Sequence, residues 1–170
     1  MNFFSLLRLI NTFLDRCLRV LLVGIFTVLA GVVLWGVASR YLFANQAPWS
    51  EELARLLMVW LALPGTALVT REESHLGLDA LVLTWPEEVR RLSGLLVHAM
   101  VFVFAAGVMA WGGGELVGQR LAYGQILPAL GISKAWFYLA QPVSGVLTAM
   151  FTLELLLTDL RRLTRTGGAS

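Results

Sequence analysis

The sequence predicts an all-α integral membrane protein with four transmembrane helices, an N-terminal amphipathic segment and a short interfacial helix between spans two and three. Four long apolar stretches support this prediction: Val20–Ser39, Leu56–Thr70, Leu92–Gly114 and Ala135–Leu153. None has an acidic or basic residue in its middle, and His98 is the only histidine within them. An apolar stretch of roughly 18 or more residues is long enough to cross a bilayer as a helix. The 58% hydrophobic and 14% charged content also fits a bundle in lipid better than a soluble globule.

The composition and the motifs point away from catalysis and from nucleic acid. A formal net charge of +2 without a basic run offers little to a nucleic acid. Cys17 is the single cysteine, which excludes an intramolecular disulfide and a cysteine-based metal cluster. The sequence contains no phosphate-cradling loop, zinc-ligand spacing or G-x-S-x-G motif. We therefore expect one non-enzymatic membrane domain over residues 1–170, with no catalytic residue, metal ligand or cofactor of its own.

The N-terminal segment, residues 1–19, has a helical period before the first span at residues 20–39. Its apolar residues share one face and its polar residues share the other. This pattern fits either a helix that lies in the membrane interface or a spanning helix that extends into the headgroups. Arg40 and Tyr41 end the span with a cation that reaches the headgroups and an interfacial ring.

The start of the second helix carries two signals. Ser50 suits an N-cap, and Pro48 suits the first turn. In either case Glu51 and Glu52 fall in the first turn, where the helix dipole favours negative charge. Arg55 lies four residues after Glu51, which is the favourable orientation for an ion pair on one face.

The remaining boundaries follow from similar signals. Pro64 lies inside the second span and predicts a kink, because proline removes one backbone hydrogen bond. A capping box at Thr84 and Glu87 predicts the start of the third span, and the triple glycine 112–114 predicts its end. The predicted segments are therefore 49–70 for span two, 76–84 for the interfacial helix, 85–114 for span three, 133–153 for span four and 154–170 for a cytoplasmic amphipathic tail.

The distribution of lysine and arginine predicts the orientation. One side, which holds both termini, has Arg8, Arg16, Arg19, Arg71, Arg90, Arg91, Arg161, Arg162 and Arg165. The other side has only Arg40, Arg55, Arg120 and Lys134. Because cytoplasmic loops carry the excess of positive charge, both termini are expected in the cytoplasm.

His98 is the one histidine within the four apolar stretches. A haem site would need a second histidine at a matching depth, and His75 lies in a polar connection. Polar side chains in spans commonly bond across helices. A hydrogen bond from His98 to a neighbouring helix or subunit is therefore the favoured interpretation.

Two polar clusters flank the second span. The outer cluster is Glu51, Glu52 and Arg55, and the inner cluster is Arg71, Glu72, His75 and Asp79. The outer cluster suits either a gate or substrate site, or a helix start that satisfies its own dipole. The inner cluster has the residue types of a proton relay but the spacing of a solvated cytoplasmic corner. The structural interpretation is favoured for both clusters.

Small residues form two seams on the predicted spans. Gly24, Gly31 and Ala38 recur every seven residues on the first span, and Gly145 and Ala149 form a small-xxx-small pair on the fourth. Such seams let helices approach closely in lipid, where no hydrophobic effect drives their association. Internal packing readily accounts for one seam and leaves the other for docking on another protein.

The middles of the spans lack acidic and basic residues. Ion-coupled transporters and pumps usually keep ionisable or unwound backbone groups near the midplane, because hydrocarbon cannot solvate an ion. We therefore expect this chain to be the partner of a transport machine and not the transporting subunit itself.

A set of motifs between Val20 and Asp79 resembles a known family. In order, they are Arg40-Tyr41, Trp49-Ser50-Glu51-Glu52, Arg55 and Arg71-Glu72…His75…Asp79. Together they are similar to the signature of the small membrane subunit of tripartite ATP-independent periplasmic (TRAP) transporters, the DctQ-like family. The length, the four spans and the cytoplasmic termini extend the resemblance along the chain, although its later half has no specific motif.

The resemblance implies a non-catalytic subunit in the bacterial inner membrane. Such a subunit braces a large membrane subunit, which carries the sodium and substrate sites, and helps to dock a periplasmic binding protein that delivers an organic anion, often a carboxylate. Arg40, Tyr41, Trp49 and the outer cluster would hold the outer corner or meet these partners, and the inner cluster would anchor the other end. The alternatives are the small subunit of a tricarboxylate-type tripartite transporter, against which the motifs argue, and the membrane anchor of a redox enzyme.

Overall fold

The computed structural model describes residues 3–42, 47–73 and 87–166. In chain order the elements are α1 (Phe3–Leu42), α2 (Pro48–Glu73), α4 (Glu87–Val103), the π-helix η1 (Phe104–Gly112), α5 (Gly113–Ala122) and α6 (Ala135–Thr166). Because α4, η1 and α5 follow one another without a break, we call them together the third helix. Within the described residues, four segments are long and apolar enough to cross a membrane: Leu6–Leu42, Pro48–Glu72, Leu92–Ala122 and Ala135–Arg161. The predicted all-α fold with four spans is confirmed.

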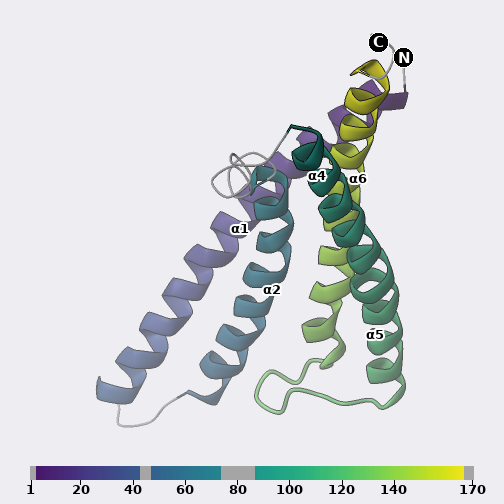
Figure 1. The fold of residues 1–170 in the computed structure, drawn as a ribbon. Helices are drawn as coiled ribbons and strands as arrows, with labels where there is room; N and C mark the ends of the chain where they lie inside the picture. The colour runs from purple at the N-terminus through teal and green to yellow at the C-terminus, as the bar shows by residue number, and fades with distance from the viewer. Residues whose placement is uncertain (1–2, 43–46, 74–86, 167–170) are drawn as a thin grey trace.

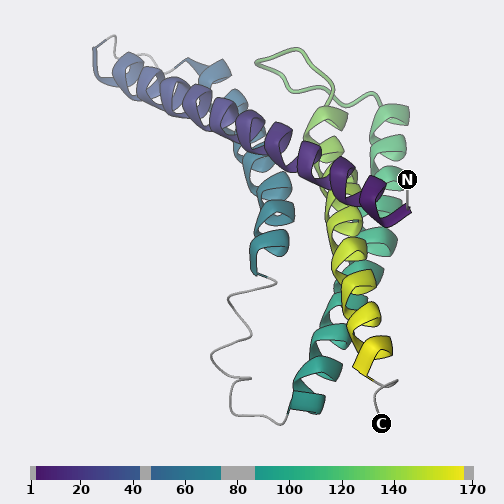
Figure 2. The ribbon, with the colours of Figure 1, turned by 90° about the horizontal axis from the view of Figure 1, so that it is seen from above.

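α6 is the central helix of the arrangement. It packs against α2 on one side and against the third helix on the other (Figure 1). α1 packs along α2, crosses the other helices obliquely and touches α6 only over a short stretch (Figure 2). The start of α1 and the end of α6 lie at the same end of the molecule, which we call the terminal end. The opposite end holds the connection 123–134, and we call it the loop end.

α6 and the third helix approach closely at two glycines. A Cβ atom placed on Gly145 would lie 2.5 Å from the backbone nitrogen of Ala110 and 2.7 Å from Cβ of Met109. A Cβ atom on Gly113 would lie 3.0 Å from Cδ of Pro142. Contact between backbones is how small residues hold helices together in lipid. The seam on α6 is therefore used inside the chain at Gly145.

A small apolar core joins α1, α2 and α6. Its buried members are Leu18, Ala67, Leu68 and Phe151, and Leu14, Leu22 and Leu147 pack against them. Many large apolar side chains lie outside this core, including Phe26 and Leu34 on α1, which are 60% and 70% exposed. Extensive exposed apolar surface indicates contact with lipid or with another protein.

The third helix corrects one predicted boundary. It does not end at the triple glycine but continues to Ala122. Gly112 and Gly113 both keep right-handed helical angles. The low helix propensity of glycine is overridden here because Gly113 packs against α6 and because hydrocarbon favours a continuously hydrogen-bonded backbone. The connection between the third helix and α6 therefore covers residues 123–134.

Three other boundaries are also clear. α1 is continuous from Phe3, so the amphipathic segment is an extension of the spanning helix. α2 begins at Pro48, and the Ser50 hydroxyl donates to the carbonyl of Ala47 at 2.8 Å. α6 continues without a break beyond Leu153, where the separate tail was predicted to begin. The predicted interfacial helix at 76–84 lies outside the described residues.

Gly145 and Gly24 lie in different environments, so an added methyl group should have opposite effects on the free energy of unfolding at the two positions. Gly145→Ala should destabilise the chain by about 1–3 kcal/mol, because overpacking a tight contact forces the backbones apart. Gly24→Ala should stabilise it by about 0.5–1 kcal/mol, since glycine is unfavourable inside a helix and the new Cβ would meet no atom within 4 Å. Reversible unfolding in mixed micelles measures both variants, and equal effects would contradict the packing described here.

Candidate functional site

At the terminal end, one buried asparagine ties α1 to two other helices. Asn11 is 0% exposed. Its Nδ2 donates to Oε2 of Glu154 at 2.7 Å and to the carbonyl of Met150 at 3.2 Å, both on α6. Arg71 of α2 donates from Nη1 to the backbone carbonyl of Asn11 at 2.7 Å, and its guanidinium lies 5.3 Å from the ring centre of Phe151. Buried polar groups need such partners, because an unpaired one is costly.

Ion pairs extend this network along α1 and α2. The carboxylate of Asp15 lies 3.0 Å from Nε of Arg19 and 3.5 Å from Nη1 of Arg71. Arg19 also donates to Oε1 of Glu72 at 2.6 Å. We call the network the polar corner; it consists of Asn11, Asp15, Arg19, Arg71, Glu72 and Glu154. Arg71 and Glu72 of the inner cluster are thus held by α1 and α6 of the same chain.

The sequence did not single out Asn11, Asp15 or Glu154 as members of this corner. Asn11 and Asp15 are four residues apart, so they share a helix face, and this spacing was an available signal. The spacing could not reveal that α1 crosses α6. This crossing brings Asn11 and Glu154, which are 143 positions apart, into contact. His75 and Asp79, the other members of the inner cluster, lie outside the described residues.

His98 joins the third helix to α6 at the terminal end. Its Nδ1 lies 2.8 Å from Oδ2 of Asp159, and the two side chains are only 13% and 25% exposed. This contact is of the kind that the sequence favoured, a hydrogen bond from His98 to a neighbouring helix. It uses one of the two ring nitrogens. Within 3–42, 47–73 and 87–166, no group of three His, Cys, Asp or Glu side chains is placed to hold a metal ion.

At the loop end, the connection 123–134 folds back on itself as a short antiparallel turn. The amide of Leu127 donates to the carbonyl of Ile132 at 2.8 Å. Gly124 and Gly131 have φ angles of 60° and 68°, a left-handed conformation that glycine adopts without steric cost. The turn therefore has a defined shape.

Glu52 fixes this turn to the start of α2. Its Oε2 accepts the backbone amides of Ala129 and Leu130, each at 3.0 Å. Glu51, the adjacent residue, instead accepts a hydrogen bond from Arg55 on the exposed face of α2. The two glutamates of the outer cluster therefore have different roles. The role of Glu52 was not visible in the sequence, since the amides that it binds come from a distant segment.

Other residues singled out at this end are exposed. Tyr41 is 82% exposed and Trp49 is 40% exposed, and Arg40 is exposed beside Tyr41. Tyr123 in the turn is 73% exposed. These four residues form what we call the loop-end surface, whose aromatic rings and cation are typical of a membrane–water boundary.

The seam on α1 remains open. A Cβ atom added to Gly24 or Gly31 would meet nothing within 4 Å, and both residues are exposed. Ala38 and Ala149 are half-buried. The structure therefore closes the seam at Gly145 and leaves the seam at Gly24 and Gly31 without a neighbouring helix in the described chain.

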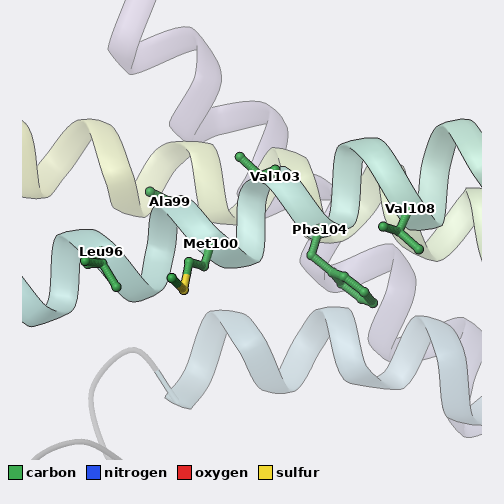
Figure 3. A pocket seen from close by; sticks show the side chains of 6 residues that line it. All are labelled: Leu96, Ala99, Met100, Val103, Phe104 and Val108. Atoms are coloured by element: carbon green, nitrogen blue, oxygen red, sulfur yellow. The ribbon is translucent and has the colours of Figure 1, made fainter.

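An apolar hollow of about 430 Å³ lies on the third helix. Its lining consists of Leu96, Ala99, Met100, Val103, Phe104 and Val108, as Figure 3 shows. A site for a polar solute needs a few polar groups to orient it. This lining has none and suits hydrocarbon.

The polar corner predicts that Asn11 is important for stability. Asn11→Leu removes two hydrogen bonds and leaves the half-buried Glu154 without its amide donor, so we expect a loss of about 1–3 kcal/mol in the free energy of unfolding. Thr12→Ala is the matched control, because Thr12 is exposed and bonds to the carbonyl of Arg8 in its own helix. Unfolding in mixed micelles compares the two, and a loss as large in Thr12→Ala would contradict the role of Asn11.

We expect the carboxylate of Glu52 to protect the amides of the turn from hydrogen exchange. In Glu52→Ala, hydrogen exchange at the amides of Ala129 and Leu130 should rise at least about tenfold, because a hydrogen bond to a charged group contributes about 1.5–3 kcal/mol. Glu51→Ala should leave this exchange unchanged. Mass spectrometry of the exchanged peptide measures both variants, and unchanged protection in Glu52→Ala would exclude Glu52 as the anchor.

The chain has relatives with assigned roles. The family model described as tripartite ATP-independent periplasmic transporters, DctQ component, matches residues 29–162. A protein of Haemophilus influenzae assigned as a TRAP transporter small permease is 31% identical over 138 residues, 81% of each chain. The sialic acid TRAP transporter small permease protein SiaQ of Vibrio cholerae is 28% identical over 148 residues, 87% of this chain and 84% of that protein.

A third relative is much longer. The sialic acid TRAP transporter permease protein SiaT of Haemophilus influenzae is 28% identical over 128 residues, which are 72% of this chain but only 20% of that protein. The family match covers most of the chain and includes the open seam at Gly31, both clusters beside α2 and the turn at the loop end. The chain belongs to the DctQ family of TRAP transporter small permease subunits and is a multi-pass membrane protein of transport, not an enzyme.

Proposed function

We propose that this small permease subunit braces the large subunit of a sodium-coupled transporter for organic anions and helps to dock a periplasmic binding protein. The sodium and substrate sites belong to the large subunit in this proposal. This chain contributes a helical frame and carries no ion itself.

The distribution of charge supports the non-transporting role. The middles of the spans carry no acidic or basic side chain. At the terminal end, Asp15, Glu72 and Glu154 are each paired with arginine or asparagine of the same chain. A residue that binds and releases an ion must exchange partners during the cycle. These carboxylates are engaged in holding helices together.

The open seam on α1 is the observation that carries the bracing role. Gly24 and Gly31 are exposed and have no atom near their potential Cβ positions, whereas Gly145 is closed by the third helix. Lipid chains can pack against a helix face of any shape, but a second helix approaches closely only where small residues such as glycine leave room for its backbone. In SiaT, a segment similar to this chain is only a fifth of a longer permease. We therefore assign the face of Gly24 and Gly31 to a helix of the large subunit.

The loop-end surface supports docking of a soluble protein. We infer from the charge distribution that both termini lie in the cytoplasm, in which case the loop end faces the periplasm. Glu52 holds the turn against α2. Tyr123 in this turn and Tyr41 and Arg40 at the end of α1 are exposed, and aromatic residues and arginine are enriched where proteins bind one another. A rigid surface also binds at a lower entropic cost than a mobile one.

Organic anions are the proposed substrate class. The similar proteins SiaQ and SiaT are named for sialic acid, which carries a carboxylate. The family match argues against the redox-anchor alternative, because it identifies the chain as a transporter subunit. The DctQ match likewise argues against the tricarboxylate-type assignment.

Enlarging the open seam tests the proposal. Gly31→Leu should leave the isolated chain folded, since the new side chain points into open space, but it should reduce copurification with the large subunit at least about tenfold, the effect of losing about 1.4 kcal/mol of binding. Val33→Leu is the matched control: Val33 is also exposed on α1 but lies on nearly the opposite face.

Uptake in proteoliposomes gives the functional readout. With the large subunit and the purified binding protein present, Gly31→Leu should lower sodium-driven uptake of the organic anion in parallel with assembly, and Val33→Leu should not. Full uptake by the large subunit without this chain, or transport by this chain alone, would contradict the proposed role.

A further inference from the structure

Three of the four spans carry an irregularity in their backbone hydrogen bonding. Pro64 in α2 and Pro142 in α6 each lack an N–H group, so the carbonyl four residues earlier has no intrahelical donor. The third helix contains η1, in which each turn is widened to i→i+5 bonding. Such sites are where long helices bend.

Direct contacts place these irregularities side by side. The Ser144 hydroxyl donates to the carbonyl of Leu63, the residue before Pro64. Gly145 lies against Met109 and Ala110 of η1. We call this region the pivot layer; it consists of residues 63–64 of α2, 109–113 of the third helix and 142–145 of α6.

A second close contact belongs to the same layer. Gly113, at the end of η1, lies against Pro142, whose Cδ would be 3.0 Å from a Cβ at that glycine. Proline and glycine present little side chain to interlock with a neighbouring helix. Packing in the layer therefore keeps the helix axes close together but does little to oppose a change in their relative orientation.

The chain is braced on both sides of this layer. Towards the loop end, Nε1 of Trp60 donates to the carbonyl of Trp136 at 3.0 Å, and Arg120 of α5 stacks at 5.1 Å on the ring of Tyr138 in α6. Towards the terminal end, the polar corner joins α1, α2 and α6. The pair of His98 and Asp159 joins the third helix to α6 there. Each end therefore has cross-links between all the helices that pass through the layer.

We propose that the two braced ends rotate relative to each other as rigid bodies about the pivot layer. The rotation changes the angle of the connection 123–134 relative to the polar corner, to which the start of α1 is bound. This inference concerns the chain by itself and stands whether or not the loop end docks a binding protein.

Distances between spin labels test the pivot on the full chain in lipid nanodiscs. Four exposed positions serve as label sites, after Cys17→Ser removes the native thiol: Met58 and Leu121 lie towards the loop end, and Val69 and Leu92 lie towards the terminal end. The pairs 58/121 and 69/92 report within one end, and the pairs 58/92 and 69/121 report across the layer. Pulsed electron resonance measures all four distance distributions.

We expect the distributions across the layer to be at least about twice as broad as those within either end, as for hinged rigid bodies. The double variant Pro64→Ala and Pro142→Ala restores two backbone donors and should narrow the distributions across the layer towards the width within one end. Pro128→Ala, in the loop-end connection, is the matched control and should change neither.

Equal widths across the layer and within the ends of the otherwise unaltered chain would overturn the proposal. So would a double variant that keeps narrow distributions within each end but remains broad across the layer. If the double variant misfolds, the distributions within each end broaden too, and the comparison in the otherwise unaltered chain then decides alone.

Discussion

Hydrocarbon solvates neither a charge nor an unpaired backbone amide, and this constraint decides where the polar contacts of the chain lie. The spans keep their middles free of acidic and basic residues, and the charges gather at the two ends. The polar side chains at these ends hold segments of the chain together: Asn11 and Arg71 join three helices at one end, and Glu52 fixes a turn at the other. The helices between them are held by glycine contacts and a small apolar core.

The same constraint accounts for the open shape of the molecule. A soluble protein of this composition would need to bury its apolar helices against one another, but in lipid they can remain apart. α1 accordingly leaves most of its surface uncovered and touches α6 only near the polar corner (Figure 2). Its crossing geometry depends on a few polar contacts, and Asn11 is the most deeply buried of the side chains that make them. The corner thus positions the face of α1 that carries Gly24 and Gly31.

The two ends differ in what their polar groups accomplish. At the terminal end, side chains bond to side chains and to helix backbone, which fixes helix crossings. At the loop end, Glu52 binds amides of a non-helical segment, so it shapes a surface instead. Glu51 and Arg55 form an exposed ion pair beside it, and such pairs contribute little to stability. Side chains with similar chemistry in one short motif therefore serve different purposes.

The sequence by itself determined the all-α class, the four spans, the family and the absence of charge from the membrane interior. These properties depend on local composition and period, which each segment carries alone. Only the tertiary structure decided which polar residues meet, because Asn11 and Glu154, or Glu52 and the amides near Ala129, are far apart in the chain. It also decided that the third helix passes through three glycines: the contact of Gly113 with Pro142 outweighs the local preference of glycine to end a helix. Long-range contacts of this kind depend on how the helices cross, and no window of sequence encodes that angle.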